Sequence, residues 1–160
     1  MSSFLYDFVP ATLIAVTLLL CCVVFFYEVL AHIWLLLPRF EGRPRTQIIL
    51  TVFSIFLAHT VCIWLFGVTY YVLDVYVDYG GVFGHHQSHF MDYIYFSGAT
   101  YSSVGFCDIY PAGALRMITT LEVLMGLIMI GWSVTFTYLV TDKYLVHKRA
   151  RHEAKRKESV

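Results

Sequence analysis

Three long apolar segments alternate with short polar segments along the 160-residue chain. They span residues 8–37, 46–73 and 112–140. Each is longer than the roughly 20 residues that a helix needs to cross the hydrocarbon core of a bilayer. The pattern therefore predicts three transmembrane helices, of which the first is long enough to tilt or to extend beyond the bilayer.

A fourth apolar segment, residues 90–101, is rich in aromatic side chains but too short to cross a membrane. The polar run 102–108 follows it directly, and Pro111 then resists the continuation of any helix. This arrangement predicts a half-length helix that enters the membrane and a loop that leaves it on the same side. The fold class that we expect is an all-α membrane protein with three transmembrane helices and one re-entrant helix and loop.

The composition agrees with a membrane location. Hydrophobic residues make up 59% of the chain and charged residues 14%, and the mean hydropathy is +0.69. Soluble domains are nearer to half apolar and one quarter charged. We expect an integral membrane protein of one small domain, with no nucleic-acid partner. Three of the four cysteines lie inside apolar segments, so neither a disulfide framework nor a zinc-type cysteine site is predicted.

The basic residues are concentrated in two places. Arg39, Arg43 and Arg45 lie between the first two long segments, and seven Lys and Arg residues lie in the tail 142–160, whereas residues 74–115 contain none. Basic segments that flank transmembrane helices remain in the cytoplasm. We therefore expect a multi-pass protein of the cell membrane, with its N-terminus and residues 74–115 outside and its C-terminus in the cytoplasm.

The polar run carries the most specific signal in the chain. Residues 99–111 read Ala-Thr-Tyr-Ser-Ser-Val-Gly-Phe-Cys-Asp-Ile-Tyr-Pro. A dehydrated cation needs oxygen ligands in place of its water, and backbone carbonyls supply them without a fixed charge. Glycine adopts the backbone angles that turn successive carbonyls the same way. The run resembles the pore signature of potassium channels, Thr-Val-Gly-Tyr-Gly-Asp followed by a short apolar-Tyr-Pro sequence.

This resemblance extends over residues 74–143 and implies a homotetramer, in which each chain adds one copy of the run to a closed ring. It implies that residues 90–101 form a pore helix and that the run is a selectivity filter. Permeant K⁺ or Na⁺ ions would bind there, and we expect no cofactor and no enzymatic activity. The filter carbonyls would come from Ser103, Val104, Gly105, Phe106 and Cys107.

Two residues depart from the signature. Ser103 replaces a threonine and keeps a hydroxyl, whereas Cys107 replaces the second glycine. A non-glycine residue in left-handed geometry costs roughly 1–2 kcal/mol. We expect the Cys107 carbonyl to turn away instead, which removes the outermost ion site and makes a weakly selective or non-selective cation channel the alternative function. The thiol either forms part of a ring at the outer mouth or packs behind the filter.

The same resemblance assigns roles to residues around the filter. Tyr95 and Phe96 take the place of the aromatic pair that buttresses the filter, and Asp108 would concentrate cations and brace the filter. Glu122, within the third long segment, would either face the pore or be buried with hydrogen bonds, because an exposed charge in a membrane is costly. The remaining candidates for filter support, a gating hinge or the pore lining are Ser102, Gly126, Ile130 and Gly131.

The histidines offer a different chemistry. His85, His86 and His89 precede the predicted pore helix and could form a weak zinc or pH-sensitive site, but a solvated loop is the favoured interpretation. Other polar residues lie inside the apolar segments and form either a proton-sensing cluster or ordinary packing contacts. These are Glu28, His32 and His59.

We divide the chain into residues 1–46 (first transmembrane helix and cytoplasmic loop), 47–141 (pore domain) and 142–160 (basic cytoplasmic tail). The expected function is that of a pore-forming subunit of a potassium-channel-like cation channel. The expected partners are further copies of the chain and membrane lipids, with anionic lipids at the basic tail. A non-conducting auxiliary subunit and a small membrane metalloprotein are alternatives from other classes.

Overall fold

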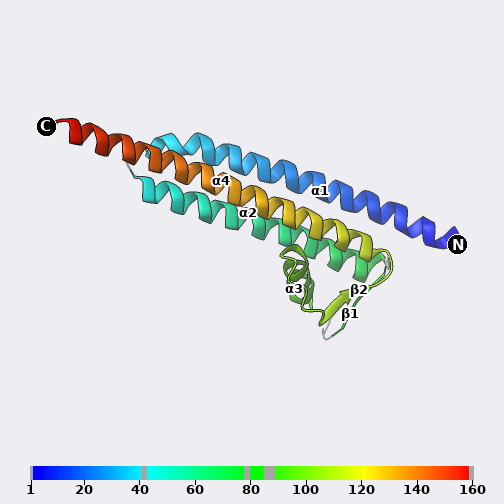
Figure 1. Ribbon diagram of the computed structural model, residues 1–160. Helices are drawn as coiled ribbons and strands as arrows, with labels where there is room; N and C mark the ends of the chain where they lie inside the picture. Colours follow the sequence, from blue (N-terminus) through cyan, green and yellow to red (C-terminus); the bar gives the residue numbers. More distant parts are fainter. Residues whose placement is uncertain (1, 41–42, 78–79, 85–88, 159–160) are drawn as a thin grey trace.

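The computed structural model describes residues 2–40, 43–77, 80–84 and 89–158. Three long helices, α1 (Ser2–Leu36), α2 (Pro44–Val72) and α4 (Leu115–Glu158), run side by side in alternating directions (Figure 1). Each contains a stretch that is long and apolar enough to cross a membrane, and these stretches are Phe8–Phe40, Arg45–Val77 and Leu115–Lys143. The prediction of three transmembrane helices is confirmed.

The last helix is longer than the sequence pattern indicated. It begins at Leu115, three residues after the start of the apolar segment 112–140, and continues to Glu158. The tail residues include many Ala, Lys, Arg and Glu, which are strong helix formers. The tail that we separated at residue 142 is therefore continuous with the third transmembrane helix, and it extends beyond the ends of α1 and α2 (Figure 1).

The short helix α3 (Phe90–Tyr101) has the bounds expected for the re-entrant helix. Its 12 residues form a helix about 18 Å long, well short of the roughly 30 Å of a bilayer core. His89 and Asp92 form a capping box at its N-terminus. The helix packs against α2 and α4 at the end of the bundle where α1 begins (Figure 1).

A small antiparallel sheet, absent from the all-helical expectation, closes the re-entrant segment. Strand β1 (Val82–Gly84) precedes α3, and strand β2 (Ile109–Pro111) follows the loop after α3. The two strands pair over their whole length, with Phe83 opposite Tyr110. The chain therefore enters and leaves the re-entrant segment at one place.

Asp74 fastens this sheet to the helices. It lies in the π-helical turn Leu73–Val77 that follows α2. Its Oδ2 accepts hydrogen bonds from the backbone N–H of Val82 at 3.2 Å and from the hydroxyl of Tyr93 at 2.7 Å. One carboxylate therefore joins α2, β1 and α3.

Helix α1 buries one stripe of its surface against α2 and α4. The members of the stripe recur at the spacing of a single helix face. Small residues occupy its N-terminal part, where they allow neighbouring helices to approach closely, and larger residues follow. The stripe consists of Ala11, Ala15, Cys22, Phe26, Leu30 and Ile33, and Leu37 continues it in the 3-10 turn after α1.

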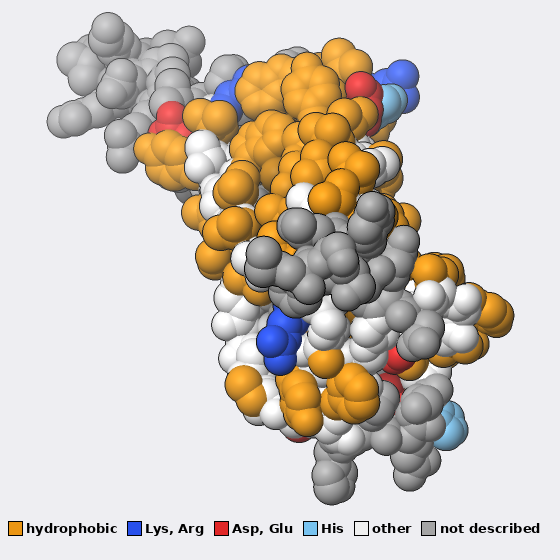
Figure 2. Space-filling view, turned by 90° about the vertical axis from the view of Figure 1, so that its right-hand side faces the viewer, with side chains coloured by type: hydrophobic (Ala, Val, Ile, Leu, Met, Phe, Trp, Pro, Cys, Tyr) orange, Lys and Arg blue, Asp and Glu red, His pale blue; other side chains and the backbone are white. Residues whose placement is uncertain are grey.

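Much of the remaining helix surface is hydrophobic and exposed (Figure 2). On α2, for example, the side chains of Phe53, Phe56 and Leu57 are exposed. Soluble monomers rarely expose extended apolar surface, whereas lipid is a suitable neighbour for it. Together with the three spans, this surface identifies a multi-pass membrane protein. All four cysteines are free thiols.

Candidate functional site

The loop between α3 and β2 lies at the surface, and its backbone alternates in handedness. Ser103, Gly105 and Cys107 have φ angles of 59°, 56° and 60°, whereas Val104 and Phe106 between them are not in the left-handed region. Such alternation rotates successive peptide planes so that neighbouring carbonyls can face one side, as an ion path lined by carbonyls requires. The side chains of Val104 and Phe106 are 56% and 65% exposed in the single chain.

Cys107 contradicts one expectation from the sequence. We expected the backbone to avoid left-handed geometry there, but Cys107 adopts it with a φ of 60°. Ser103 adopts the same geometry, which was not expected at all. Because each non-glycine residue in this region costs roughly 1–2 kcal/mol, the loop contains backbone strain at both positions.

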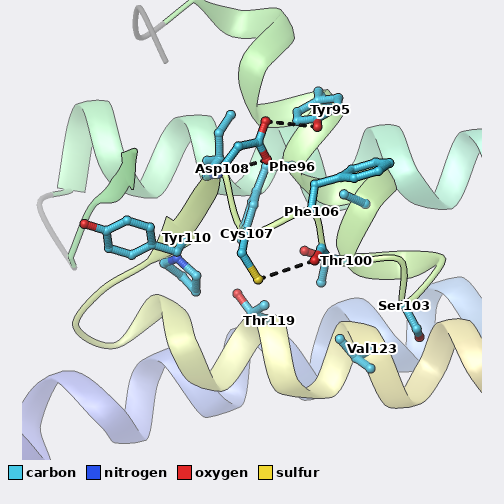
Figure 3. Close-up of a pocket in the computed structure, with 14 residues that line it drawn as sticks. Tyr95, Phe96, Thr100, Ser103, Phe106, Cys107, Asp108, Tyr110, Thr119 and Val123 are labelled. Carbon is cyan, nitrogen blue, oxygen red and sulfur yellow. Dashed lines mark hydrogen bonds between the residues drawn. The ribbon is translucent and has the colours of Figure 1, made fainter. Parts of the chain in front are cut away.

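The Cys107 side chain lies behind the loop (Figure 3). Its Sγ donates a hydrogen bond to the carbonyl oxygen of Gly105 at 3.3 Å, and it points toward Thr119 of α4. The side chain lines a cavity of about 300 Å³ between the loop, α3 and α4, together with Thr100 and Val123. Cys107 is nevertheless exposed in the single chain, so the structure supports the position behind the loop without burying the thiol there.

Backbone hydrogen bonds hold the loop to the C-terminal end of α3. The N–H groups of Val104 and Gly105 both donate to the carbonyl of Ala99, at 3.1 and 3.2 Å, and the N–H of Ser103 donates to the carbonyl of Thr100 at 2.9 Å. These bonds satisfy carbonyls that a helix end otherwise leaves free. The partly negative end of α3 therefore lies next to the loop, where it favours a cation.

Tyr95 and Asp108 connect the helix to the far end of the loop (Figure 3). The Tyr95 hydroxyl donates to Asp108 Oδ2 at 3.0 Å, and the backbone N–H of Ile109 donates to Asp108 Oδ1 at 3.1 Å. The Tyr95 ring also stacks on Phe106, with 6.2 Å between ring centroids. Partial removal from water and the neighbouring carboxylate raise the pKa of the Tyr95 phenol, so the phenol keeps the proton that it donates to Asp108.

Phe96 and Ser102 contact α2 and α3 rather than Asp108. The buried Phe96 ring packs edge-on against Tyr70 of α2, with 5.0 Å between centroids, and it also lines the cavity behind the loop. The Ser102 hydroxyl donates to the carbonyl of Gly98 at 2.7 Å. Of the predicted aromatic pair, Tyr95 thus holds the loop directly, whereas Phe96 anchors the helix behind it.

The candidates on α4 lie in different environments. Glu122 is 0% exposed and bonded to α2 and α3, so its assignment as a pore-lining residue is wrong and the buried alternative describes it. A Cβ on Gly126 would lie 2.0 Å from the carbonyl oxygen of Tyr101, so this glycine permits close packing of α4 against the end of α3. Ile130 and Gly131 are exposed, and α4 continues through all four positions.

A polar node centred on the partly buried His59 of α2 corresponds to the packing alternative considered for this residue, but its partners were not predicted from the sequence. The Nδ1 atom of His59 lies 2.8 Å from the Tyr101 hydroxyl, and Nε2 lies 2.9 Å from the Ser133 hydroxyl. The Phe26 ring of α1 contacts the imidazole, with 4.9 Å between centroids. The node therefore connects all four helices beneath the last residue of α3. Its members are 42 and 74 residues apart in the chain, so no local pattern indicates it.

The other predicted polar groups do not join this node. Glu28 and His32 form an exposed pair on α1, with 3.8 Å between His32 Nδ1 and Glu28 Oε2, so of the two alternatives for these residues the cluster with His59 is wrong. His89 caps α3, while His85 and His86 lie outside the described residues. Among the described residues, no group of three or more His, Cys, Asp and Glu side chains could hold a metal ion.

Comparison with known proteins gives one result for this region. A family model with the description "Ion channel" matches residues 58–141, more than half of the 160-residue chain. The matched part begins within α2, includes α3, the loop and both strands, and ends within α4. No curated protein and no solved structure matches the chain.

Proposed function

Since the chain belongs to the ion channel family, we propose that it is the pore-forming subunit of a potassium-channel-like cation channel and that residues 103–107 are its filter. One observation carries this proposal, namely the alternation of left-handed residues at Ser103, Gly105 and Cys107 in an exposed loop at the carbonyl end of a half-length helix. A chance turn between two helices needs no such alternation. Ions would move passively down their electrochemical gradient.

A complete pore needs several copies of the chain. One chain contributes a single row of carbonyls, whereas a dehydrated cation has to be surrounded. The exposed Val104 and Phe106 side chains lie on a face that a neighbouring subunit would cover. We therefore propose a homotetramer, the number that the potassium-channel resemblance implies.

The orientation follows from charge and topology together. The loop with Arg39, Arg43 and Arg45 and the basic end of α4 lie at one end of the bundle, and the filter lies at the other end together with the start of α1 (Figure 1). The positive-inside rule supports a cytoplasmic location for the basic end. The filter would then face the exterior, and the tail would be near anionic lipid headgroups.

The proposal includes preference for K⁺, and weak cation selectivity is the alternative. Cys107 favours the alternative for two reasons: its backbone is strained, and its thiol occupies one lone pair of the Gly105 carbonyl. Gly105 itself adopts the geometry that the signature requires, with a φ of 56°.

The decisive experiment is ion flux through the purified protein in liposomes, with K⁺, Na⁺ and a larger organic cation compared. We expect K⁺ to pass fastest and the organic cation to be excluded. Equal K⁺ and Na⁺ fluxes would favour the weakly selective alternative. A silent or monomeric protein would contradict the proposal and favour an auxiliary subunit.

A matched pair of variants tests whether the loop is the filter. Gly105→Ala places a Cβ in open space but at a φ of 56°, so it should strain the loop by roughly 1–2 kcal/mol and reduce K⁺ flux or selectivity. Gly131→Ala also places a Cβ in open space, but without positive φ, and should keep the selectivity of the unmodified protein. Equal behaviour of the two variants would argue against the assigned filter.

A further inference from the structure

Glu122 is an acid buried in the membrane-spanning part of α4 without a basic partner. Its side chain is 0% exposed, within the span Leu115–Lys143. The ion pair found among the described residues joins His32 to Glu28 on the surface of α1, away from Glu122. A charge at the centre of a membrane helix costs about 3 kcal/mol on insertion scales. The surroundings of Glu122 must therefore stabilise it in another way.

The hydrogen atoms on the α3 side of Glu122 can be counted. Ser97 Oγ lies 2.8 Å from the carbonyl oxygen of Ile63 and 2.5 Å from Glu122 Oε1. A serine hydroxyl has one hydrogen, and a backbone carbonyl can only accept. This hydrogen can serve only one of the two contacts, and of the two partners only Glu122 can carry a proton of its own, so both contacts have a hydrogen when Ser97 donates to Ile63. The hydrogen between Ser97 and Glu122 must then belong to Glu122.

The α2 side of Glu122 gives a consistent count. The Tyr70 hydroxyl lies 2.5 Å from Glu122 Oε2 and 3.3 Å from Thr119 Oγ1. Thr119 uses its own hydrogen in a 3.0 Å bond to the carbonyl of Leu115, so the Tyr70 hydrogen goes to the closer oxygen, Glu122 Oε2. With a protonated Glu122, the four hydrogens of Ser97, Glu122, Tyr70 and Thr119 serve four of the five contacts, and only the longest, between Tyr70 and Thr119 at 3.3 Å, has none. With a carboxylate, one of the two Ser97 contacts has none.

From this count we propose that Glu122 is a neutral carboxylic acid that positions the pore helix, donating to Ser97 from Oε1 and accepting from Tyr70 at Oε2. The acid joins α4 to α3 and α2 at one point. Ser97 lies two residues after Tyr95, whose hydroxyl holds Asp108 at the end of the filter loop. A shift of α3 at Ser97 is therefore transmitted to the loop, and this part of the inference rests on the proposed function.

The proposal has a defined pH dependence. Loss of the Glu122 proton leaves the single Ser97 hydrogen for two acceptors, the carboxylate and the Ile63 carbonyl, so one of the two Ser97 bonds is lost. Rising pH therefore weakens the attachment of α3, and falling pH restores it. The titratable groups that face Glu122 are Tyr70 from α2, Tyr101 from α3 and Cys22 from α1, and none of them is basic.

The protonation state can be measured without ion conduction. Infrared difference spectra of the full-length protein in lipid, compared with those of Glu122→Gln, should contain the carbonyl stretching band of a protonated carboxyl group at neutral pH. In Ser97→Ala this band should shift, because the acid loses its acceptor. The proposal would be overturned if the unmodified protein had no protonated-carboxyl band, or if its band persisted in Glu122→Gln. This result does not depend on whether the protein conducts ions.

Ion flux tests the positioning role. Glutamine presents an N–H₂ donor and a carbonyl acceptor, the same pattern as the neutral acid, so Glu122→Gln should retain assembly and K⁺ preference. The unmodified protein should lose K⁺ preference as the pH rises, whereas Glu122→Gln should keep it. An equal loss of K⁺ preference in both proteins at high pH would contradict the positioning role. The role would also be contradicted if Glu122→Gln did not assemble although the unmodified protein has the protonated-carboxyl band.

Discussion

Cys107 combines two effects that substitutions can separate. Its backbone is left-handed, with a φ of 60°, and its thiol donates to the carbonyl of Gly105. Both effects act on the outer half of the proposed filter. The first depends on the presence of a Cβ, and the second depends on the sulfur.

We expect Cys107→Gly to increase K⁺ selectivity, because it removes the strain and frees the Gly105 carbonyl. Cys107→Ala keeps the Cβ and removes only the thiol, so it should have a smaller effect. The stability gain of the glycine variant is small, since roughly 1–2 kcal/mol of relieved strain is offset by about 0.4–1 kcal/mol of unfolded-state entropy. Reversal potentials measure the selectivity. Indistinguishable permeability ratios in all three proteins would refute the role assigned to Cys107.

Tyr95 also combines two interactions, the hydrogen bond to Asp108 and the ring stack on Phe106. We expect Tyr95→Phe, which removes only the hydrogen bond, to shorten the conducting periods of single channels, because Asp108 then loses its link to α3. Tyr110→Phe is the control, since among the described residues the Tyr110 hydroxyl has no hydrogen-bond partner. If the two variants behave alike in single-channel recordings, Tyr95 does not brace the loop through Asp108.

At the scale of elements, α3 is held by side chains from α2, from the turn that follows α2 and from α4. Tyr93 bonds to Asp74, Ser97 to Glu122 and Tyr101 to His59. These contacts are hydrogen bonds in a segment surrounded by apolar residues. A buried polar group that loses its hydrogen-bond partner there costs about 1–3 kcal/mol of stability. Helix α3 is consequently fixed in both rotation and depth.

Gly126→Ala tests the packing between α3 and α4. The new Cβ would lie 2.0 Å from the carbonyl oxygen of Tyr101, so the helices must separate. An overpacking cost of about 1–3 kcal/mol exceeds the gain in helix propensity of up to about 1 kcal/mol. In Gly131→Ala the new Cβ meets no other atom within 4 Å, so this variant gains helix propensity and has no steric clash. Thermal unfolding in detergent should therefore show opposite shifts, and a stabilised Gly126→Ala would contradict the close packing.

The main features that could be predicted from the sequence are those with a local signal. The three spans follow from apolar length, and the bounds of α3 follow from an aromatic segment ending at a polar run. The sheet was missed because strands of three residues have no recognisable period. The partners of His59 could not be predicted, because they meet only when the helices pack. At Cys107 the expected backbone was wrong, since the bonds from Val104 and Gly105 to α3 fix the loop despite the strain.

At the scale of the whole molecule, ten of the 11 Lys and Arg residues lie in the loop after α1 or in the tail, and the exception is Arg116. Trypsin cleaves after these residues, so the proposed orientation can be tested directly. When trypsin is added outside sealed right-side-out vesicles, we expect it to cleave the chain only after Arg116, if it cleaves the chain at all, and to leave the tail intact. In inside-out vesicles the tail should be removed, as detected by mass spectrometry. Loss of the tail from right-side-out vesicles would reverse the orientation.

The uninterrupted α4 has a mechanical consequence. Its 44 residues make a rod about 66 Å long, of which about 36 Å extends beyond a bilayer core of about 30 Å. A tilt of about 10° within the bilayer would displace the far tip by about 6 Å, because a helix without a break acts as a lever arm. A pull on the distal end is likewise transmitted as torque to the contact between Gly126 and Tyr101, next to the start of the proposed filter loop.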